Sequence, residues 1–278
     1  MSTPIYIPER FKRIIHLHII KNMLVRPPAR EPLFLGIHGP SGDGKTFQCE
    51  HVLEEMDVKA FLISGGQLED HYAGEPAKLI RTTYLNAHRY VEKGGNKMAA
   101  IVMNDVDTGV GKWEGLVEYT VNRQNVFGEL MHLADYPNSV MGVQTARIPI
   151  IMTGNDFTKL YEPLVRAGRM TAFEWLPTAE EKAKIIDPIF SYLSKEECLR
   201  LVEHFSEEPL SFFPVLKSTI SDNLLYERIQ RVGVRQIMAQ TSKGREVLPE
   251  LKASYKELVH TGETLVDSGQ LLNHLRHL

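Results

Sequence analysis

Cysteine is scarce in this sequence: its 278 residues include only Cys49 and Cys198. The two lie far apart and lack the close spacing of metal ligands. So few cysteines exclude a secreted protein held together by disulfides, and we expect two reduced thiols.

Long apolar runs and a targeting segment are also missing. The longest apolar stretches have the length of a strand, which is too short to cross a bilayer. The first ten residues, MSTPIYIPER, lack the apolar core of a signal peptide. We therefore expect a cytoplasmic protein with no membrane partner.

Neither sign of charge dominates the chain. Lys and Arg number 32, Asp and Glu number 35, and the formal net charge is −3. This balance gives no reason to expect nonspecific binding to nucleic acid. A composition that is 43% hydrophobic and 24% charged is that of an ordinary globular protein with one large domain or two small ones.

Short apolar runs alternate with helical patterns in the first two thirds of the chain. The five runs are residues 33–38, 60–63, 99–104, 148–152 and 172–175. Nearly continuous apolar strands are typical of a parallel sheet covered on both faces. A clear helical pattern begins at Pro76 and ends at Gly94-Gly95. The alternation predicts an α/β fold with a doubly wound, five-stranded parallel sheet.

The pattern changes after Trp175. The segments 178–181 (TAEE) and 194–197 (SKEE) are both capping-box sequences that open helical stretches, and no convincing strand pattern follows. We predict an α/β subdomain over residues 1–176 and an α-helical subdomain over residues 177–278.

A phosphate-binding loop follows the first apolar run. Residues 39–46 match the Walker A pattern and lead into a helical run that begins at Phe47. The loop residues that would surround the phosphates are Gly39, Pro40, Ser41, Gly42, Asp43 and Gly44. Lys45 would neutralise the β- and γ-phosphates, and the Thr46 hydroxyl would bind Mg²⁺. The alternative, a glycine-rich turn without a ligand, is disfavoured by the strand before the loop and the helix after it.

Polar residues end the third apolar run. Asn104, Asp105 and Asp107 follow four apolar residues, at the edge of the sheet where α/β proteins bind ligands. One carboxylate there can help to hold Mg²⁺, and another can orient or deprotonate the attacking water. The alternative is a capped strand end with solvated acids, and the Walker A loop upstream favours the catalytic interpretation.

Several stretches resemble the AAA+ ATPase module and, more narrowly, Rubisco activases of the green and cyanobacterial type. The resemblance runs from about Tyr6 to Thr178 and continues more faintly into the helical region. The stretches that carry it are residues 35–39, 44–50, 73–81, 104–107, 119–122, 133–135, 149–157 and 163–170. The resemblance implies ATP as the nucleotide and a lid function for the helical subdomain.

The resemblance also implies roles for individual residues in hydrolysis. Asn104 stands at the Walker B position, where AAA+ proteins usually carry Asp, and would hold Mg²⁺ with Thr46 and Asp105. Asp105 stands at the position of the catalytic Glu. Asn155 falls at sensor 1, which holds the attacking water, although it could instead cap a turn. Arg166 and Arg169 fall at arginine-finger positions that reach the neighbouring subunit's nucleotide, and their alternative is an ordinary surface charge.

Further residues are assigned to nucleotide contact and to the client. Tyr6 and Ile7 resemble the segment that covers the adenine, and Phe47, directly after the Walker A loop, is also assigned to nucleotide contact. At the sensor 2 region the family carries two arginines, and this sequence has Lys217 and Thr219 at those positions. Whether the lid is coupled to the γ-phosphate is therefore an open question.

Two aromatic residues fall in the loops that face the pore of an AAA+ ring. Tyr72 would lie in the first pore loop and Trp113 in the second. Each could grip a protein client or merely pack within its own chain.

These observations favour an ATPase that forms a homo-oligomeric ring of six and remodels a protein client, as a chaperone does. The resemblance makes the client Rubisco, freed of an inhibitory sugar phosphate. We expect neither the amino-terminal domain of plant activases nor an appended domain like the Rubisco small subunit, which leaves the client less certain than the ATPase. A different protein client is the first alternative. A monomeric P-loop phosphotransferase and a nucleic-acid loader are the others, disfavoured by the finger-like arginines and by the net charge.

Overall fold

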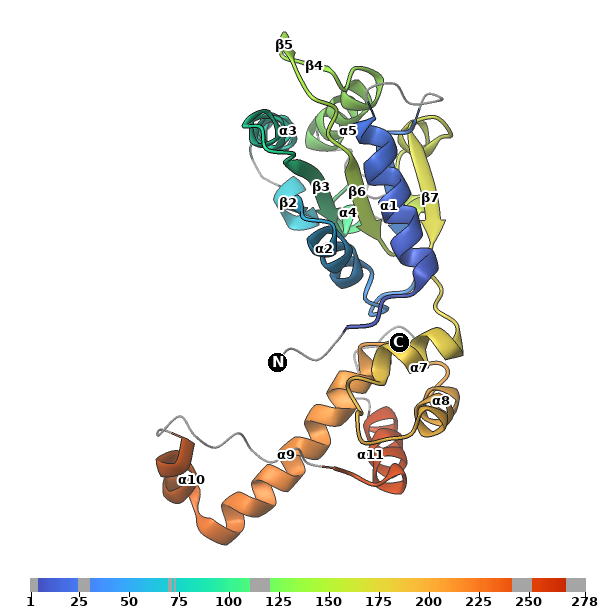
Figure 1. Ribbon diagram of the computed structural model, residues 1–278, viewed down its shortest axis with the longest axis vertical. Coiled ribbons are helices and arrows are strands. Elements are labelled where there is room, and N and C mark those ends of the chain that lie inside the picture. The colour runs from blue at the N-terminus through green and yellow to red at the C-terminus, as the bar shows by residue number, and fades with distance from the viewer. Residues whose placement is uncertain are drawn as a thin grey trace. The chain divides into compact units, whose positions relative to one another are not determined.

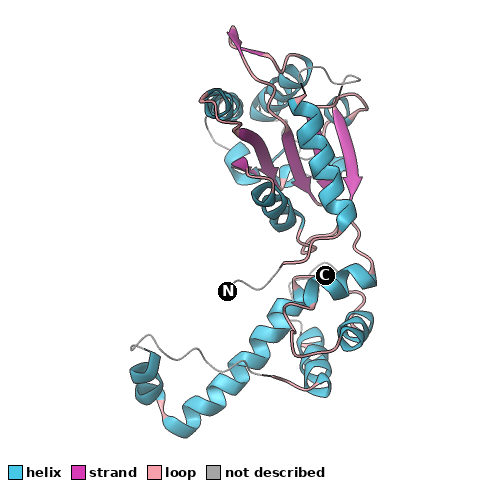
Figure 2. Cartoon of the chain, in the orientation of Figure 1, coloured by secondary structure: helices cyan, strands magenta, loops and turns pink. Residues whose placement is uncertain are grey.

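The computed structural model describes residues 5–24, 31–69, 72, 74–110, 121–241 and 252–268. Contacts divide the chain into two compact units. The α/β unit is Ile7–Leu176, and the helical unit is Pro177–Leu278 together with Met1–Tyr6. Figure 1 shows the order of the elements along the chain, and Figure 2 shows that the strands of the main sheet all belong to the α/β unit.

The main sheet has five parallel strands in the order β2-β3-β6-β1-β7. They are β1 (Phe34–His38), β2 (Val58–Ser64), β3 (Met98–Asn104), β6 (Ile150–Gly154) and β7 (Met170–Glu174). Each overlaps one of the five predicted apolar runs, so the predicted fold is confirmed. The chain passes over intervening strands between β1 and β2 and between β6 and β7. The carboxyl ends of β3, β6 and β1 therefore lie side by side at one end of the sheet.

Helices cover both faces of this sheet, as its continuous apolar strands require. The helices of the unit are α1 (Glu9–Met23), α2 (Lys45–Glu55), α3 (Glu75–Glu92), α4 (Val106–Val110), α5 (Val121–Asp135) and α6 (Glu162–Val165). The unit also contains the short 3₁₀ turns η1 (Gly65–Leu68) and η2 (Phe157–Lys159) and a hairpin of β4 (Ser139–Val140) and β5 (Val143–Gln144). Helices α1 and α2 lie together on one face (Figure 1). Buried residues of α3 and α5 share a core with alternate residues of β1, β3 and β6.

The helical unit has a core of its own. Its helices are α7 (Ala179–Ile186), α8 (Lys195–His204), α9 (Phe212–Val232), α10 (Val234–Thr241) and α11 (Tyr255–Asp267). The predicted capping boxes at Thr178 and Ser194 are confirmed, and Ser254 forms a third at the start of α11. Both cysteines are buried free thiols. Within the parts of the chain that the structure describes, every helix is too short or too polar to span a bilayer.

A close approach between α11 and Phe205 gives a test of the helical core. A methyl group on Gly262 would lie 2.3 Å from the Phe205 ring. We expect Gly262→Ala to lower the free energy of unfolding by about 1–3 kcal/mol, because the ring must move to admit the methyl. Gly128 in α5 is the matched control, since a methyl there meets nothing within 4 Å. Gly128→Ala should raise the free energy of unfolding by up to about 1 kcal/mol. Denaturant unfolding followed by circular dichroism measures both, and a Gly262→Ala variant as stable as the unaltered chain would contradict this packing.

Candidate active site

The Walker A loop joins β1 to α2 in a backbone conformation that demands glycine. Gly39, Gly42 and Gly44 have φ of 149°, 84° and 71°, which residues with a side chain rarely adopt. A side chain on Gly39 would also meet the Trp175 carbonyl at 2.2 Å. The Trp175 indole Nε1 donates to the Asp43 carbonyl at 2.8 Å, which ties the loop to the segment after β7. The predicted order of strand, Walker A loop and helix is therefore present as β1, residues 39–44 and α2.

Lys45 is the first residue of α2, and its ammonium is enclosed by the loop. Its Nζ donates to the carbonyls of Gly39 at 2.9 Å and Pro40 at 2.8 Å, and to Asn155 Oδ1 at 3.1 Å. These contacts match the three donors of an ammonium group. Burial lowers the pKa of Lys45 below its usual value, and nearby carboxylates, Asp43 first, oppose that shift. The structure thus brings Lys45 together with the predicted sensor residue Asn155, which lies 110 positions away in the sequence.

A short chain of polar contacts links α2 to the end of β3. The Thr46 hydroxyl lies 3.0 Å from the hydroxyl of Thr153, a fully buried residue of β6. Thr153 Oγ1 in turn donates to Asn104 Oδ1 at 3.4 Å. Two of the predicted metal ligands, Thr46 and Asn104, are therefore joined through Thr153, which sequence reasoning missed because its pattern is simply that of a strand residue.

Asp105 follows β3 directly and is exposed. Its φ of 52° lies in the left-handed region, which is unusual for a residue with a side chain. The Thr108 amide and hydroxyl both donate to the Asp105 carbonyl, at 3.1 and 2.6 Å, and stabilise this turn. Among the described residues, no group of three or more His, Cys, Asp or Glu side chains is placed to hold a metal ion.

Asp107, unlike Asp105, is buried. Only 2% of it is exposed, and its Oδ2 accepts the backbone amides of Asn155 and Asp156, both at 2.9 Å. The sequence places it among the acids at the end of β3 but gives no sign that it would turn inward. The buried carboxylate therefore connects the first turn of α4 to the turn that carries Asn155.

The two predicted finger arginines lie in different environments. Arg166 directly follows α6 as its C-cap and is exposed. Arg169 forms a two-point contact with Asp135, with Nε to Oδ1 at 3.2 Å and Nη2 to Oδ2 at 2.7 Å. Its Nη1 also donates to the Pro163 carbonyl at 2.8 Å. The structure therefore leaves Arg166 on the surface and holds Arg169 within its own α/β unit.

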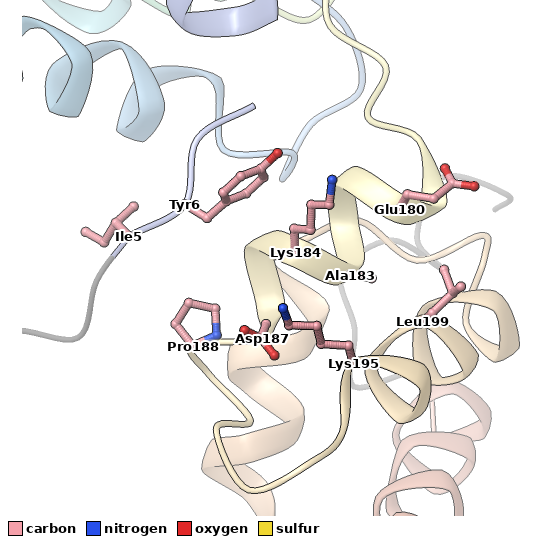
Figure 3. Close-up of a pocket in the computed structure, with 9 residues that line it drawn as sticks. All are labelled: Ile5, Tyr6, Glu180, Ala183, Lys184, Asp187, Pro188, Lys195 and Leu199. Atoms are coloured by element: carbon pink, nitrogen blue, oxygen red, sulfur yellow. The ribbon is translucent and has the colours of Figure 1, made fainter. Parts of the chain in front are cut away.

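The helical unit contains a hollow of about 580 Å³ lined by Tyr6 and by α7 and α8. Figure 3 shows the Tyr6 ring beside Lys184, whose Nζ lies 5.9 Å from the ring centroid. The remaining lining residues are Ile5, Glu180, Ala183, Asp187, Pro188, Lys195 and Leu199. Ile7, the other residue predicted to cover the adenine, is buried and belongs to the α/β unit.

The remaining predicted residues are spread over both units. Lys217 in α9 is half-buried, and its ammonium donates to the Ile189 carbonyl, a contact within the helical unit. Phe47 in α2 is exposed and stacks on His51. Tyr72 is 76% exposed, so its ring does not pack into the core. Trp113 lies outside the described residues.

The parallel sheet, the Walker A loop and the polar residues after β3 and β6 define the fold of a P-loop nucleoside triphosphatase (NTPase), which a helical unit follows. Residues 35–178 match the family model "ATPase family associated with various cellular activities (AAA)". Residues 179–274 match "Ribulose bisphosphate carboxylase/oxygenase activase, AAA, helical". The chain therefore belongs to the AAA ATPase family, and its helical unit is of the Rubisco activase type.

Curated relatives align with almost the whole of this chain. The ribulose bisphosphate carboxylase/oxygenase activase of Nostoc sp. is 41% identical over 275 residues, covering 96% of this chain and 65% of the relative. The chloroplastic activase of Arabidopsis thaliana is 38% identical over 277 residues, covering 96% of this chain and 58% of the relative. The chain thus spans somewhat less than two thirds of the length of these relatives.

Proposed function

We propose that this protein binds and hydrolyses ATP at the Walker A loop. The observation that carries the proposal is the contact of Lys45 with Asn155, since it joins the phosphate-binding loop to a polar side chain at the neighbouring strand end. Phosphate oxygens would replace the loop carbonyls as partners of the ammonium. Asn155 would then hold the attacking water near the γ-phosphate. Asp105, which is exposed and follows the neighbouring strand β3, would orient or deprotonate that water.

We propose Thr46, Asn104 and Asp105 as the residues that hold Mg²⁺. Their oxygen donors suit this ion, and so small a protein donor set fits because Mg²⁺ in nucleotide sites takes most of its ligands from phosphates and water. The bound ion would neutralise charge on the β- and γ-phosphates. The Thr46–Thr153–Asn104 contacts support the proposal, because they hold two of these residues in fixed positions.

Arg166 is proposed to complete the site of a neighbouring subunit in a ring, which the resemblance suggests has six members. An exposed guanidinium at the end of α6 can reach beyond its own chain, whereas Arg169 is paired with Asp135. We propose that Arg169 contributes chiefly by fixing the segment that carries Arg166. The Arg169 amide supports this, since it donates to the Arg166 carbonyl at 3.2 Å.

The helical residues 177–278 are proposed to act as a lid. Tyr6 and Ile7 would contact the adenine, and Phe47 would contact the nucleotide beside the loop. Lys217 would act at the sensor 2 position. The contact of Lys217 with Ile189 gives it a role in holding the lid together as well.

The proposed client is Rubisco that carries an inhibitory sugar phosphate. The cytoplasmic location of this protein stays a prediction. The match of the helical unit to the activase helical family supports this client over another protein. Tyr72, which is 76% exposed, is proposed to contact the client from the first loop, and Trp113 is proposed to do so from the second.

Reactivation of inhibited Rubisco tests the client. Rubisco loaded with ribulose bisphosphate before carbamylation should regain carboxylation within minutes when this chain and ATP are added. The same mixture with the Lys45→Ala variant should stay inhibited, because its turnover of ATP should be about 1,000-fold lower. ATP hydrolysis without reactivation of Rubisco from the source organism would point to another client and leave the ATPase proposal standing.

A further inference from the structure

Asp107 is a buried carboxylate to which the proposed mechanism gives no part. A buried charge costs several kcal/mol unless hydrogen bonds compensate it. Here two backbone amides donate to a single oxygen, Oδ2, at 2.9 Å each. Hydrogen bonds to a charged acceptor are about twice as strong as those between neutral groups. The carboxylate is therefore a firm anchor for the turn at Asn155 and Asp156.

The other carboxylate oxygen shows how closely Asp107 is packed on that turn. Oδ1 is buried and, among the described residues, has no hydrogen-bond partner. A Cβ atom at position 154 would lie 2.5 Å from Asp107 Oδ1. Because residue 154 is glycine, the carboxylate can lie directly against the backbone. The position of Asp107 is therefore fixed from both sides, by Gly154 and by the two amides.

The turn that Asp107 anchors carries the side chain that contacts Lys45. The backbone amide of Asn155 donates to Asp107 Oδ2, and its side-chain Oδ1 accepts a hydrogen bond from Lys45. Three segments distant in sequence thus meet at Asn155: the start of α4, the end of β6 and the start of α2. Without the carboxylate, the amides of Asn155 and Asp156 would lose their hydrogen-bond acceptor, and the turn would lose its fixed geometry.

We propose that Asp107 is a positioning residue that acts through the Asn155 amide and holds the Asn155 side chain in register with Lys45. The inference rests on the proposed role of Asn155 in orienting the attacking water. Asp107 itself touches neither the nucleotide nor the water in this assignment. The Asp107 carboxylate also acts electrostatically on the Lys45 ammonium, so the test must separate an effect that passes through Asn155 from one that does not.

Steady-state ATP hydrolysis tests the inference. Asp107→Ala should lower kcat about 100-fold, because a displacement of about 1 Å in a positioned group has an effect of that size. Binding of a fluorescent ADP analogue should be nearly unchanged, since the Walker A loop is intact. Asp107→Asn keeps one acceptor oxygen without the charge and should lose only about tenfold. If the alanine variant does not fold, the asparagine variant is used in its place throughout.

A double-mutant cycle separates positioning from general damage. Once Asn155→Ala has removed the side chain that Asp107 positions, adding Asp107→Ala should lower kcat further by less than about threefold. Losses that multiply in the double variant would show that Asp107 acts independently of Asn155 and would overturn the inference.

Tyr84→Phe is the matched control for stability. The Tyr84 hydroxyl donates to the Pro137 carbonyl at 2.7 Å and accepts the Ile148 amide at 3.0 Å, so its loss also leaves a buried amide unpaired in the α/β unit. We expect it to lower the melting temperature without lowering kcat. A drop in kcat comparable to that of Asp107→Ala would assign the effect to stability and contradict positioning.

Failure of the inference can be told from failure of the proposed function. Full turnover in Asp107→Ala together with lost turnover in Asn155→Ala would overturn the inference alone. Full turnover in Asn155→Ala, or no hydrolysis by the unaltered chain, would overturn the proposed role of Asn155 and the inference with it.

Discussion

Replacing Lys45 with alanine should lower kcat/KM for ATP by about 1,000-fold. The ammonium is the cation enclosed by the Walker A loop, and it is held by two loop carbonyls and by Asn155. Its loss removes the charge that would face the β- and γ-phosphates, in the ground state and more strongly as negative charge develops in the transition state. We expect nucleotide binding to weaken as well, because the buried position makes the interaction less screened by water.

Lys59→Ala is the control for this variant. Lys59 is an exposed residue of β2, on a strand at the far edge of the sheet from β1. Its replacement should leave binding and turnover unchanged. Titration of a fluorescent ATP analogue and a phosphate-release assay measure the two properties. Retention of more than about a tenth of the unaltered turnover in Lys45→Ala would contradict a transition-state role for this lysine.

The second large effect is expected at Arg166. Arg166→Ala should lower turnover by about 1,000-fold, the size of effect seen when an arginine finger is removed. Binding of ATP should persist, because the residue directly follows α6 on the surface and makes none of the Walker A contacts. Loss of turnover with binding retained is the pattern of an interaction made only in the transition state.

Two other arginines give controls for Arg166. Arg89 is exposed on α3, and Arg89→Ala should leave turnover unchanged. Arg169→Ala should lower stability as well as turnover, because it breaks the two-point contact with Asp135 and the bond to the Pro163 carbonyl. Stability losses of equal size in Arg166→Ala and Arg169→Ala would contradict the different environments that the structure assigns to them.

The sequence predicted those parts of the molecule that depend on neighbouring residues in the chain. The Walker A loop, the five strands and the capping boxes at Thr178 and Ser194 each have a local pattern, and the structure confirms them. The hairpin of β4 and β5 was not predicted, because two strands of two residues each carry too little periodicity.

Contacts between distant segments could not be predicted in the same way. The inward turn of Asp107 depends on the amides of Asn155 and Asp156, and nothing near position 107 shows it. The same holds for the contact of Arg169 with Asp135, although both residues belong to stretches that carry the family resemblance. A charged side chain is usually exposed, so the sequence alone favours solvent for both. Only the folded chain shows which carboxylate is an anchor and which arginine is left on the surface.

ATP turnover in mixtures of two inactive variants tests the central claim most directly, namely that each site joins the Walker A loop of one chain to Arg166 of the next. Lys45→Ala chains supply Arg166, and Arg166→Ala chains supply Lys45. In an equal, randomly assembled mixture about a quarter of the junctions would hold both intact residues, so about a quarter of the unaltered turnover should return. A mixture no more active than the average of the two variants alone would contradict the shared site.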